Sequence, residues 1–171
     1  MDNIYLIGFM GTGKSTVGRQ LAGEAGFRFL DLDEEIEKEQ GRKIREIFAQ
    51  DGEEYFRTCE TSLLKKLAQS RGQVISCGGG TVLRPENVQE MKKSGIVVLL
   101  MARPGTVYER VRNRSSRPLL NGNMNESYIA EMMAKREPAY RNAADHSVAT
   151  DGRSPKELAG DILDLCKNHL R

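Results

Sequence analysis

Short apolar runs alternate along the chain with longer stretches in which apolar residues recur every three or four positions. The first pattern is typical of buried strands and the second of amphipathic helices. Strands are expected at residues 4–9, 27–32, 73–77, 95–102 and 146–150. Because helical stretches separate these strands, the pattern predicts an α/β fold of three layers, a parallel sheet flanked by helices on both faces.

The end of the chain carries a helix signal. In SPKEL, Ser154 can cap a helix, Pro155 suits its first position and Glu157 completes a capping box. No repeat, low-complexity tract or linker interrupts the 171 residues, so residues 1–171 are expected to form a single domain. The polar segment 112–124 lies between two helical patterns, and a loop of this length is often a mobile lid.

Composition and charge exclude several classes. The 26 basic and 24 acidic residues nearly balance, so nothing calls for a nucleic acid or membrane surface as partner. The apolar run IVVLLMA is too short to cross a bilayer, and the chain starts with a strand pattern instead of a signal peptide. Three distant cysteines suggest neither disulfides nor a zinc site. We therefore expect a cytoplasmic protein that binds small molecules, and a monomer.

A glycine-rich loop follows the first expected strand. Residues 8–15, GFMGTGKS, fit the phosphate-binding pattern G-x-x-x-x-G-K-[ST]. Such a loop turns backbone N–H groups towards a polyphosphate, and the helix that follows adds its N-terminal dipole. Lys14 would reach the β- and γ-phosphates, and the hydroxyl of Ser15 would bind Mg²⁺. A plain strand-to-helix turn is the alternative interpretation.

Other motifs narrow the class of nucleotide-binding protein to which the chain could belong. The guanine-reading N-K-x-D and the D-x-x-G of GTPases are missing, and VISC runs into glycines instead of the acidic strand end of motor ATPases. The second strand ends in DLD, which would bring Asp31 and Asp33 to the same side at the carboxyl edge of the sheet. One carboxylate could steer Mg²⁺ through water and the other could bind an attacking hydroxyl; alternatively, Asp33 only opens a helix.

Arginines and glycines complete the set of candidates. Arg57 lies in a helical pattern and could make a solvated ion pair with Glu60, three residues on. Gly78, Gly79 and Gly80 follow a strand, where consecutive glycines suggest close approach of another molecule. Arg117, in the long loop, could stabilise charge on a transferred phosphoryl group, and Arg136 lies near the end of the next helical stretch.

Taken in order, GFMGTGKSTVGRQLA, DLD, FRTCE, GGG, RPLL and KREPAYR resemble the shikimate kinases, which have the P-loop nucleoside-monophosphate-kinase fold. The resemblance covers nearly the whole chain. It implies transfer of the γ-phosphoryl group of ATP to the 3-hydroxyl of shikimate, with Mg²⁺ as cofactor, a lid over residues 112–124 and a substrate-binding region over residues 33–60.

The resemblance also implies roles for particular residues. Asp33 would bind the accepting hydroxyl and receive its proton, Asp31 would hold the metal through water, and Lys14 and Arg117 would act on the phosphoryl group. Shikimate would be bound by Asp33, Arg57, Gly78, Gly79, Gly80 and Arg136. ATP would be bound by Gly11, Thr12, Gly13, Lys14, Ser15, Thr16, Arg110, Arg117, Arg153 and Pro155.

Two alternatives stay open on the sequence alone. One is another small-acid kinase of the same fold, such as a gluconate kinase, which would share the glycine loop. The other is a nucleotide-binding module without catalysis, which the presence of Lys14, Asp33 and Arg117 disfavours.

Overall fold

The computed structural model describes residues 2–112 and 125–170 and contains a parallel sheet of five strands in the order β2-β3-β1-β4-β5. The strands are β1 (Asn3–Ile7), β2 (Arg28–Asp31), β3 (Gln73–Ser76), β4 (Gly95–Met101) and β5 (His146–Ala149). All five agree with the apolar runs in the sequence to within three residues at either end. Because every strand runs the same way, the loops that follow them meet at one edge of the sheet.

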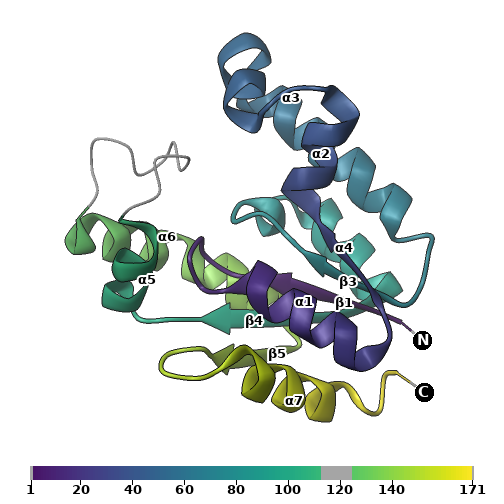
Figure 1. Ribbon diagram of the computed structural model, residues 1–171. Coiled ribbons are helices and arrows are strands. Elements are labelled where there is room, and N and C mark those ends of the chain that lie inside the picture. Colours follow the sequence, from purple (N-terminus) through teal and green to yellow (C-terminus); the bar gives the residue numbers. More distant parts are fainter. Residues whose placement is uncertain (1, 113–124, 171) are drawn as a thin grey trace.

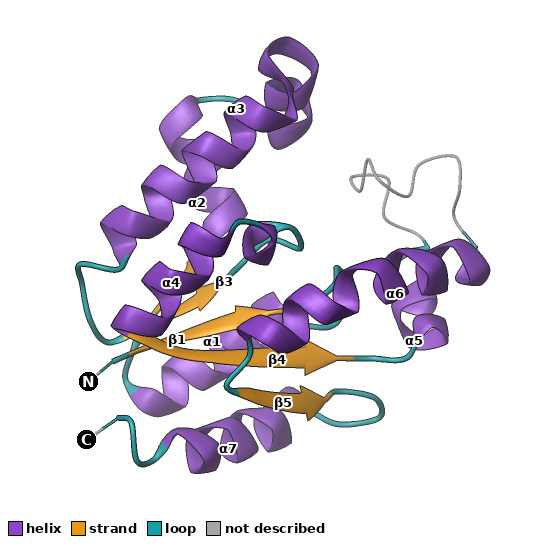
Figure 2. Ribbon diagram, turned by 180° about the vertical axis from the view of Figure 1, so that it is seen from behind, coloured by secondary structure: helices purple, strands orange, loops and turns teal. Residues whose placement is uncertain are grey.

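Helices cover both faces of this sheet (Figures 1 and 2). The helices of the described residues are α1 (Lys14–Ala25), α2 (Leu32–Gln40), α3 (Ile44–Leu67), α4 (Pro85–Ser94), α5 (Pro104–Val111), α6 (Glu126–Ala143) and α7 (Pro155–Cys166), with a short 3-10 helix η1 (Thr81–Leu83). Helices α1 and α7 pack side by side on one face, and α4 and α6 lie on the other. The predicted three-layer α/β architecture is confirmed.

The core shows why the sheet is buried on both sides. Successive residues of β1 point to opposite faces, so Ile4 and Leu6 pack under α1 and α7, whereas Tyr5 and Ile7 pack under α4 and α6. All four side chains are fully buried. A strand buried on both faces needs a continuous apolar run, which is what the sequence provides.

Helices α2 and α3 form a unit that projects from the sheet edge beyond β2 (Figure 1). A separate small core of Leu32, Ile36, Ile47, Phe56 and Leu63 holds the two helices together. Within α3, Gly52 has φ 86° and ψ 169°, which kinks the helix. This unit carries most of the predicted substrate-binding region, residues 33–60.

Two boundaries refine the sequence prediction. The second strand ends at Asp31, and Leu32 already begins α2, so Asp31 and Asp33 do not lie on one strand as DLD suggested. The side chain of Asp31 accepts a hydrogen bond from Glu34 N, so Asp31, and not Asp33, caps the helix. At the other end, Ser154 caps α7 and Pro155 occupies its first turn, as predicted.

In the described ranges, no helix combines the length and apolar character needed to cross a bilayer.

Candidate active site

The glycine loop between β1 and α1 has a backbone that side chains would strain. Gly8, Gly11 and Gly13 have φ angles of 144°, 77° and 97°, in the region that favours glycine. Gly13 immediately precedes α1, so the N-terminus of that helix opens onto the loop. Backbone N–H groups at a helix N-terminus and the helix dipole favour a bound anion. The geometry agrees with a phosphate cradle and not with an ordinary turn.

Polar side chains tighten the loop. Lys14 Nζ donates to the carbonyl oxygens of Gly8 at 2.8 Å and Phe9 at 3.0 Å, and the buried Thr12 hydroxyl donates to the same Phe9 oxygen at 2.8 Å. The Lys14 ammonium group is therefore held over the loop. Thr12, predicted to bind ATP, directs both its hydroxyl and its backbone N–H, the latter at 3.4 Å, to the carbonyl oxygen of Phe9.

The two predicted metal-binding residues are in direct contact. Ser15 Oγ donates to Asp31 Oδ2 at 2.8 Å, which joins the first turn of α1 to the end of β2. A hydroxyl and a carboxylate are hard oxygen donors of the kind that Mg²⁺ prefers. Within the described residues, no cluster of three or more His, Cys, Asp or Glu could hold a metal by itself. A magnesium ion here would need phosphate oxygens and water for its other ligands.

The three glycines after β3 each face a different predicted substrate residue. A Cβ atom added to Gly78 would lie 2.9 Å from Asp33 Oδ1, and one added to Gly79 would lie 3.0 Å from Arg136 Nη1. At Gly80, the added Cβ would lie 2.6 Å from Arg57 Cζ. Side chains at Gly78 and Gly80 would therefore collide with the site. From the sequence, the consecutive glycines suggested close approach of another molecule. The structure shows that side chains of this same chain also approach them closely.

Arg57 is held by a buried carboxylate. Its Nη1 lies 3.0 Å from Glu60 Oε1, and Glu60 Oε2 accepts a hydrogen bond from Thr81 Oγ1 at 2.8 Å. The ion pair with Glu60 expected from the sequence is present, but Glu60 is completely buried and the Arg57 side chain is 13% exposed, so the pair is buried and not solvated. The guanidinium is fixed against the glycine segment. Thr81 is a supporting residue that sequence reasoning missed, although it directly follows the GGG motif, and Glu60 was recognised only as a solvated partner of Arg57.

Tyr140 is a further residue that the sequence did not single out. Its hydroxyl donates to the carbonyl oxygen of Gly79 at 2.6 Å, and its side chain is buried. Burial raises the pKa of the Tyr140 phenol, while the charges of Arg136 and Arg57 oppose that rise. Its place in KREPAYR, one turn after Arg136, was the only available signal.

Four of the residues predicted to bind ATP lie after the glycine loop in the chain: Arg110, Arg117, Arg153 and Pro155. Arg110 Nη1 donates to Gly11 O at 3.0 Å and lies 3.3 Å from Thr150 Oγ1, so it sits against the glycine loop. Arg153 pairs with Asp161 and Glu157 along α7, and Pro155 begins that helix. Arg117 and residues 113–124 of the predicted lid lie outside the described residues.

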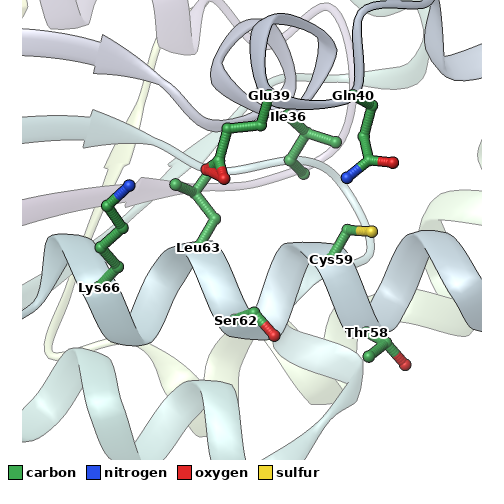
Figure 3. A pocket seen from close by; sticks show the side chains of 8 residues that line it. All are labelled: Ile36, Glu39, Gln40, Thr58, Cys59, Ser62, Leu63 and Lys66. Carbon is green, nitrogen blue, oxygen red and sulfur yellow. The ribbon is translucent and has the colours of Figure 1, made fainter.

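A cavity of about 310 Å³ lies elsewhere, between α2 and α3 (Figure 3). Its walls include Ile36, Cys59 and Lys66, and it contains none of the predicted site residues. On α3, residues 58, 59, 62, 63 and 66 face this cavity, whereas Arg57 and Glu60 lie on the face that approaches the glycine segment. The cavity and the candidate active site are therefore on opposite sides of one helix.

The fold and the site together define a P-loop phosphotransferase: a phosphate cradle and a cluster of aspartate and arginine side chains share one edge of a parallel sheet. The sequence model of the shikimate kinase family matches residues 10–167. A shikimate kinase of Persephonella marina is 46% identical over 163 residues, which cover 95% of this chain and 98% of that protein. One of Pelotomaculum thermopropionicum is 45% identical over 170 residues, covering 99% and 98%.

A solved structure agrees. Shikimate kinase from Acinetobacter baumannii, in complex with shikimate, superposes with a TM-score of 0.93 at 38% identity, covering 99% of this chain and 94% of that one. The chain belongs to the shikimate kinase family and is an ATP-dependent kinase.

Proposed function

We propose that this kinase transfers the γ-phosphoryl group of ATP to the 3-hydroxyl of shikimate, with the acid held by Asp33, Arg57 and Arg136 around the segment Gly78–Gly80. The observation that carries the proposal is the convergence of these three side chains on three consecutive glycines. The glycine loop before α1 opens at the same edge of the sheet. A small acid and a nucleotide bound in these places would lie next to each other.

The nucleotide phosphates would be bound by residues 11–16, through backbone N–H groups, the N-terminus of α1 and the Lys14 ammonium group. The Lys14 ammonium group has three N–H donors, and its hydrogen bonds to the carbonyl oxygens of Gly8 and Phe9 hold it over the loop. Phosphoryl transfer needs little covalent help, so positioning and charge stabilisation are the main contributions we assign to this region. Arg110, Arg153 and Pro155 are assigned to the adenine end.

We assign Mg²⁺ to the junction of Ser15 and Asp31. The hydrogen bond between them keeps both oxygen donors at the mouth of the phosphate loop. Ser15 would bind the ion directly, and Asp31 would hold one of its water molecules. When bound, the ion neutralises charge that develops on the phosphate oxygens.

The acid substrate supplies the nucleophile. Arg57 and Arg136 present planar guanidinium groups, which match the geometry of a carboxylate. Asp33 then receives the proton of the 3-hydroxyl as that oxygen bonds to the γ-phosphorus and the bond from the γ-phosphorus to the bridging oxygen of ADP breaks. Glu60 and Thr81 support Arg57 from behind, so its charge remains aimed at the pocket.

Three features are predicted from the sequence. These are closure of a lid over residues 112–124 with Arg117 on the γ-phosphate, the organisation of residues 1–171 as one kinase domain, and action as a monomer in the cytoplasm. The lid arginine would complete the charge stabilisation and exclude water from the reaction.

A coupled assay of ADP formation tests the proposal. The purified chain should form ADP rapidly with shikimate and only slowly with gluconate or without an acid, and mass spectrometry should find phosphorylated shikimate. Stimulation by gluconate alone would favour the other small-acid kinase. ATP binding without any phosphorylated acid would favour a nucleotide-binding module. In a matched pair, Arg136→Ala should raise the KM for shikimate about tenfold or more, whereas Arg141→Ala, an exposed arginine on the same helix, should leave it unchanged.

A further inference from the structure

The hydroxyl of Tyr140 makes a contact between two distant parts of the site. Tyr140 lies on α6, one helical turn after Arg136, and is 5% exposed. Its Oη donates to the carbonyl oxygen of Gly79, 61 residues away in the chain, at 2.6 Å. The helix that carries one of the arginines is thereby tied to the glycine segment after β3.

The glycine segment has few other means of staying in place. Without side chains, residues 78–80 cannot pack into the core, and glycine has the most conformational freedom to lose. Two of the three carbonyl oxygens are bound locally, because Thr81 N donates to Gly78 O at 3.2 Å and Leu83 N donates to Gly80 O at 3.1 Å. The carbonyl of Gly79, between them, is bound by a side chain from another helix.

The neighbours of that carbonyl are the groups assigned to the acid. Arg136 Nη1 lies 3.0 Å from where a Cβ of Gly79 would be, and the same position is 3.6 Å from Tyr140 Oη. Gly78 and Gly80, on either side, face Asp33 and Arg57. A rotation of the Gly79 peptide would therefore change the backbone surface that faces Asp33, Arg57 and Arg136.

The phenol is suited to donating this bond permanently. Burial raises the pKa of Tyr140 above its ordinary value, so the hydroxyl stays protonated at neutral pH despite the nearby guanidinium groups of Arg136 and Arg57. The Arg136 guanidinium and the Tyr140 hydroxyl both approach Gly79, at 3.0 and 3.6 Å from the position of an added Cβ, so the phenol lies beside both the peptide and the arginine.

We propose that Tyr140 is a positioning residue for the acid substrate, because its hydroxyl fixes the Gly79 peptide relative to the Arg136 guanidinium. The inference rests on the proposed binding of shikimate by Arg57 and Arg136. Tyr140 itself is not assigned a contact with either substrate. Its loss should therefore weaken acid binding more than it slows the chemical step or weakens ATP binding.

Tyr140→Phe removes the hydroxyl and keeps the buried ring. We expect the KM for shikimate to rise about five- to tenfold, while kcat and the KM for ATP change less than twofold. Tyr5→Phe is the matched control. Tyr5 is fully buried and its Oη makes a 2.6 Å hydrogen bond with Ser94, which ends α4 at the opposite edge of the sheet. This control should lower the melting temperature and leave all three kinetic constants unchanged.

A third variant, Arg136→Lys, separates the inference from the function on which it rests. If Arg136→Lys and Tyr140→Phe both raise the KM for shikimate and Tyr5→Phe does not, the inference holds. If Arg136→Lys raises it and Tyr140→Phe does not, Tyr140 is only structural and the inference is overturned. If the unsubstituted enzyme does not phosphorylate shikimate, or Arg136→Lys leaves its KM unchanged, the proposed binding of the acid fails first. Equal increases in the KM values for shikimate and ATP in Tyr140→Phe would also overturn the inference.

Discussion

The two glycine segments of the site use the same residue type for different physical reasons. In the loop before α1, Gly13 has φ 97°, a backbone angle that other residues rarely adopt, and an added Cβ would find its nearest neighbours 3.9 Å away. After β3, Gly80 has φ −105°, which any residue tolerates, but an added Cβ would run into the guanidinium of Arg57. Gly13 is required for its backbone angle, and Gly80 for the side chain that approaches it. At Gly8 and Gly11 both reasons apply, because an added Cβ would collide with Leu100 O at the first and lie 2.8 Å from Val111 Cγ1 at the second.

The two halves of the site also differ in how they are assembled from the chain. The phosphate loop is contiguous, so eight consecutive residues define its chemistry. The proposed acid site combines side chains from α2, α3 and α6 with the glycine segment; Glu60 pairs with Arg57 and accepts from Thr81, and Tyr140 donates to the Gly79 carbonyl oxygen. A change in the loop should therefore affect the nucleotide, and a change in the pocket should affect the acid.

The largest effect is expected at the phosphate loop. Lys14→Ala removes the charge aimed at the migrating phosphoryl group, and kcat/KM for ATP should fall on the order of 10³-fold. Steady-state kinetics at saturating shikimate measure this. Lys167→Ala, an exposed lysine near the end of α7, is the control and should keep full activity. Near-normal turnover of Lys14→Ala would contradict the role of the loop.

The next largest effect is expected in the acid pocket. Asp33→Asn keeps the size of the side chain but cannot accept the hydroxyl proton as a carboxylate does, so kcat should fall about 10²-fold. The KM for shikimate should change much less, because an amide still hydrogen-bonds a hydroxyl. Pre-steady-state measurement of ADP formation isolates the chemical step. An unchanged kcat would place the proton acceptor elsewhere.

A pair of glycine variants tests the comparison itself. Gly80→Ala should displace Arg57 and raise the KM for shikimate about tenfold, with little change in the KM for ATP. Gly13→Ala should strain the phosphate loop and raise the KM for ATP by a similar factor, about tenfold, with little change for shikimate. If both variants weakened both substrates equally, the two segments would not be separate in function.

The smallest effect concerns Cys77, directly before the second glycine segment. Burial raises the pKa of its thiol, with the charge of Glu60 acting in the same direction, so the reactive thiolate is scarce at neutral or mildly alkaline pH. Iodoacetamide added to the native enzyme should leave Cys77 and the buried Cys166 unmodified and react at most with the half-buried Cys59. Peptide mass mapping measures this, with the unfolded chain as the positive control for all three thiols. Rapid labelling of Cys77 in the native enzyme would contradict the burial of this thiol at the end of β3.

Sequence reasoning reached the fold and the phosphate loop because their signals are local. Apolar runs identify buried strands, and GFMGTGKS carries its own chemistry. The boundary at Asp31 was harder to predict, because β2 passes into α2 without a turn and DLD is compatible with either element. Two supporting contacts were missed for a different reason. The spacing to Arg57 indicated Glu60, but its bond with Thr81 and that of Tyr140 with Gly79 span 21 and 61 residues, and no periodicity in the chain indicates such pairs.

The resemblance to known kinases supplied what local signals could not. Arg57 and Arg136 are ordinary helix residues by pattern, and only the order of the six motifs assigned them to one ligand. The structure brings both guanidinium groups to the same three glycines, which gives that assignment a physical basis.

A crystal structure of the enzyme with shikimate and a non-hydrolysable ATP analogue tests the central claim most directly. The account predicts the carboxylate between Arg57 and Arg136, the 3-hydroxyl on Asp33, and the nucleotide phosphates within the loop before α1. Shikimate bound in the cavity between α2 and α3, or Asp33 turned away from the bound acid, would contradict it.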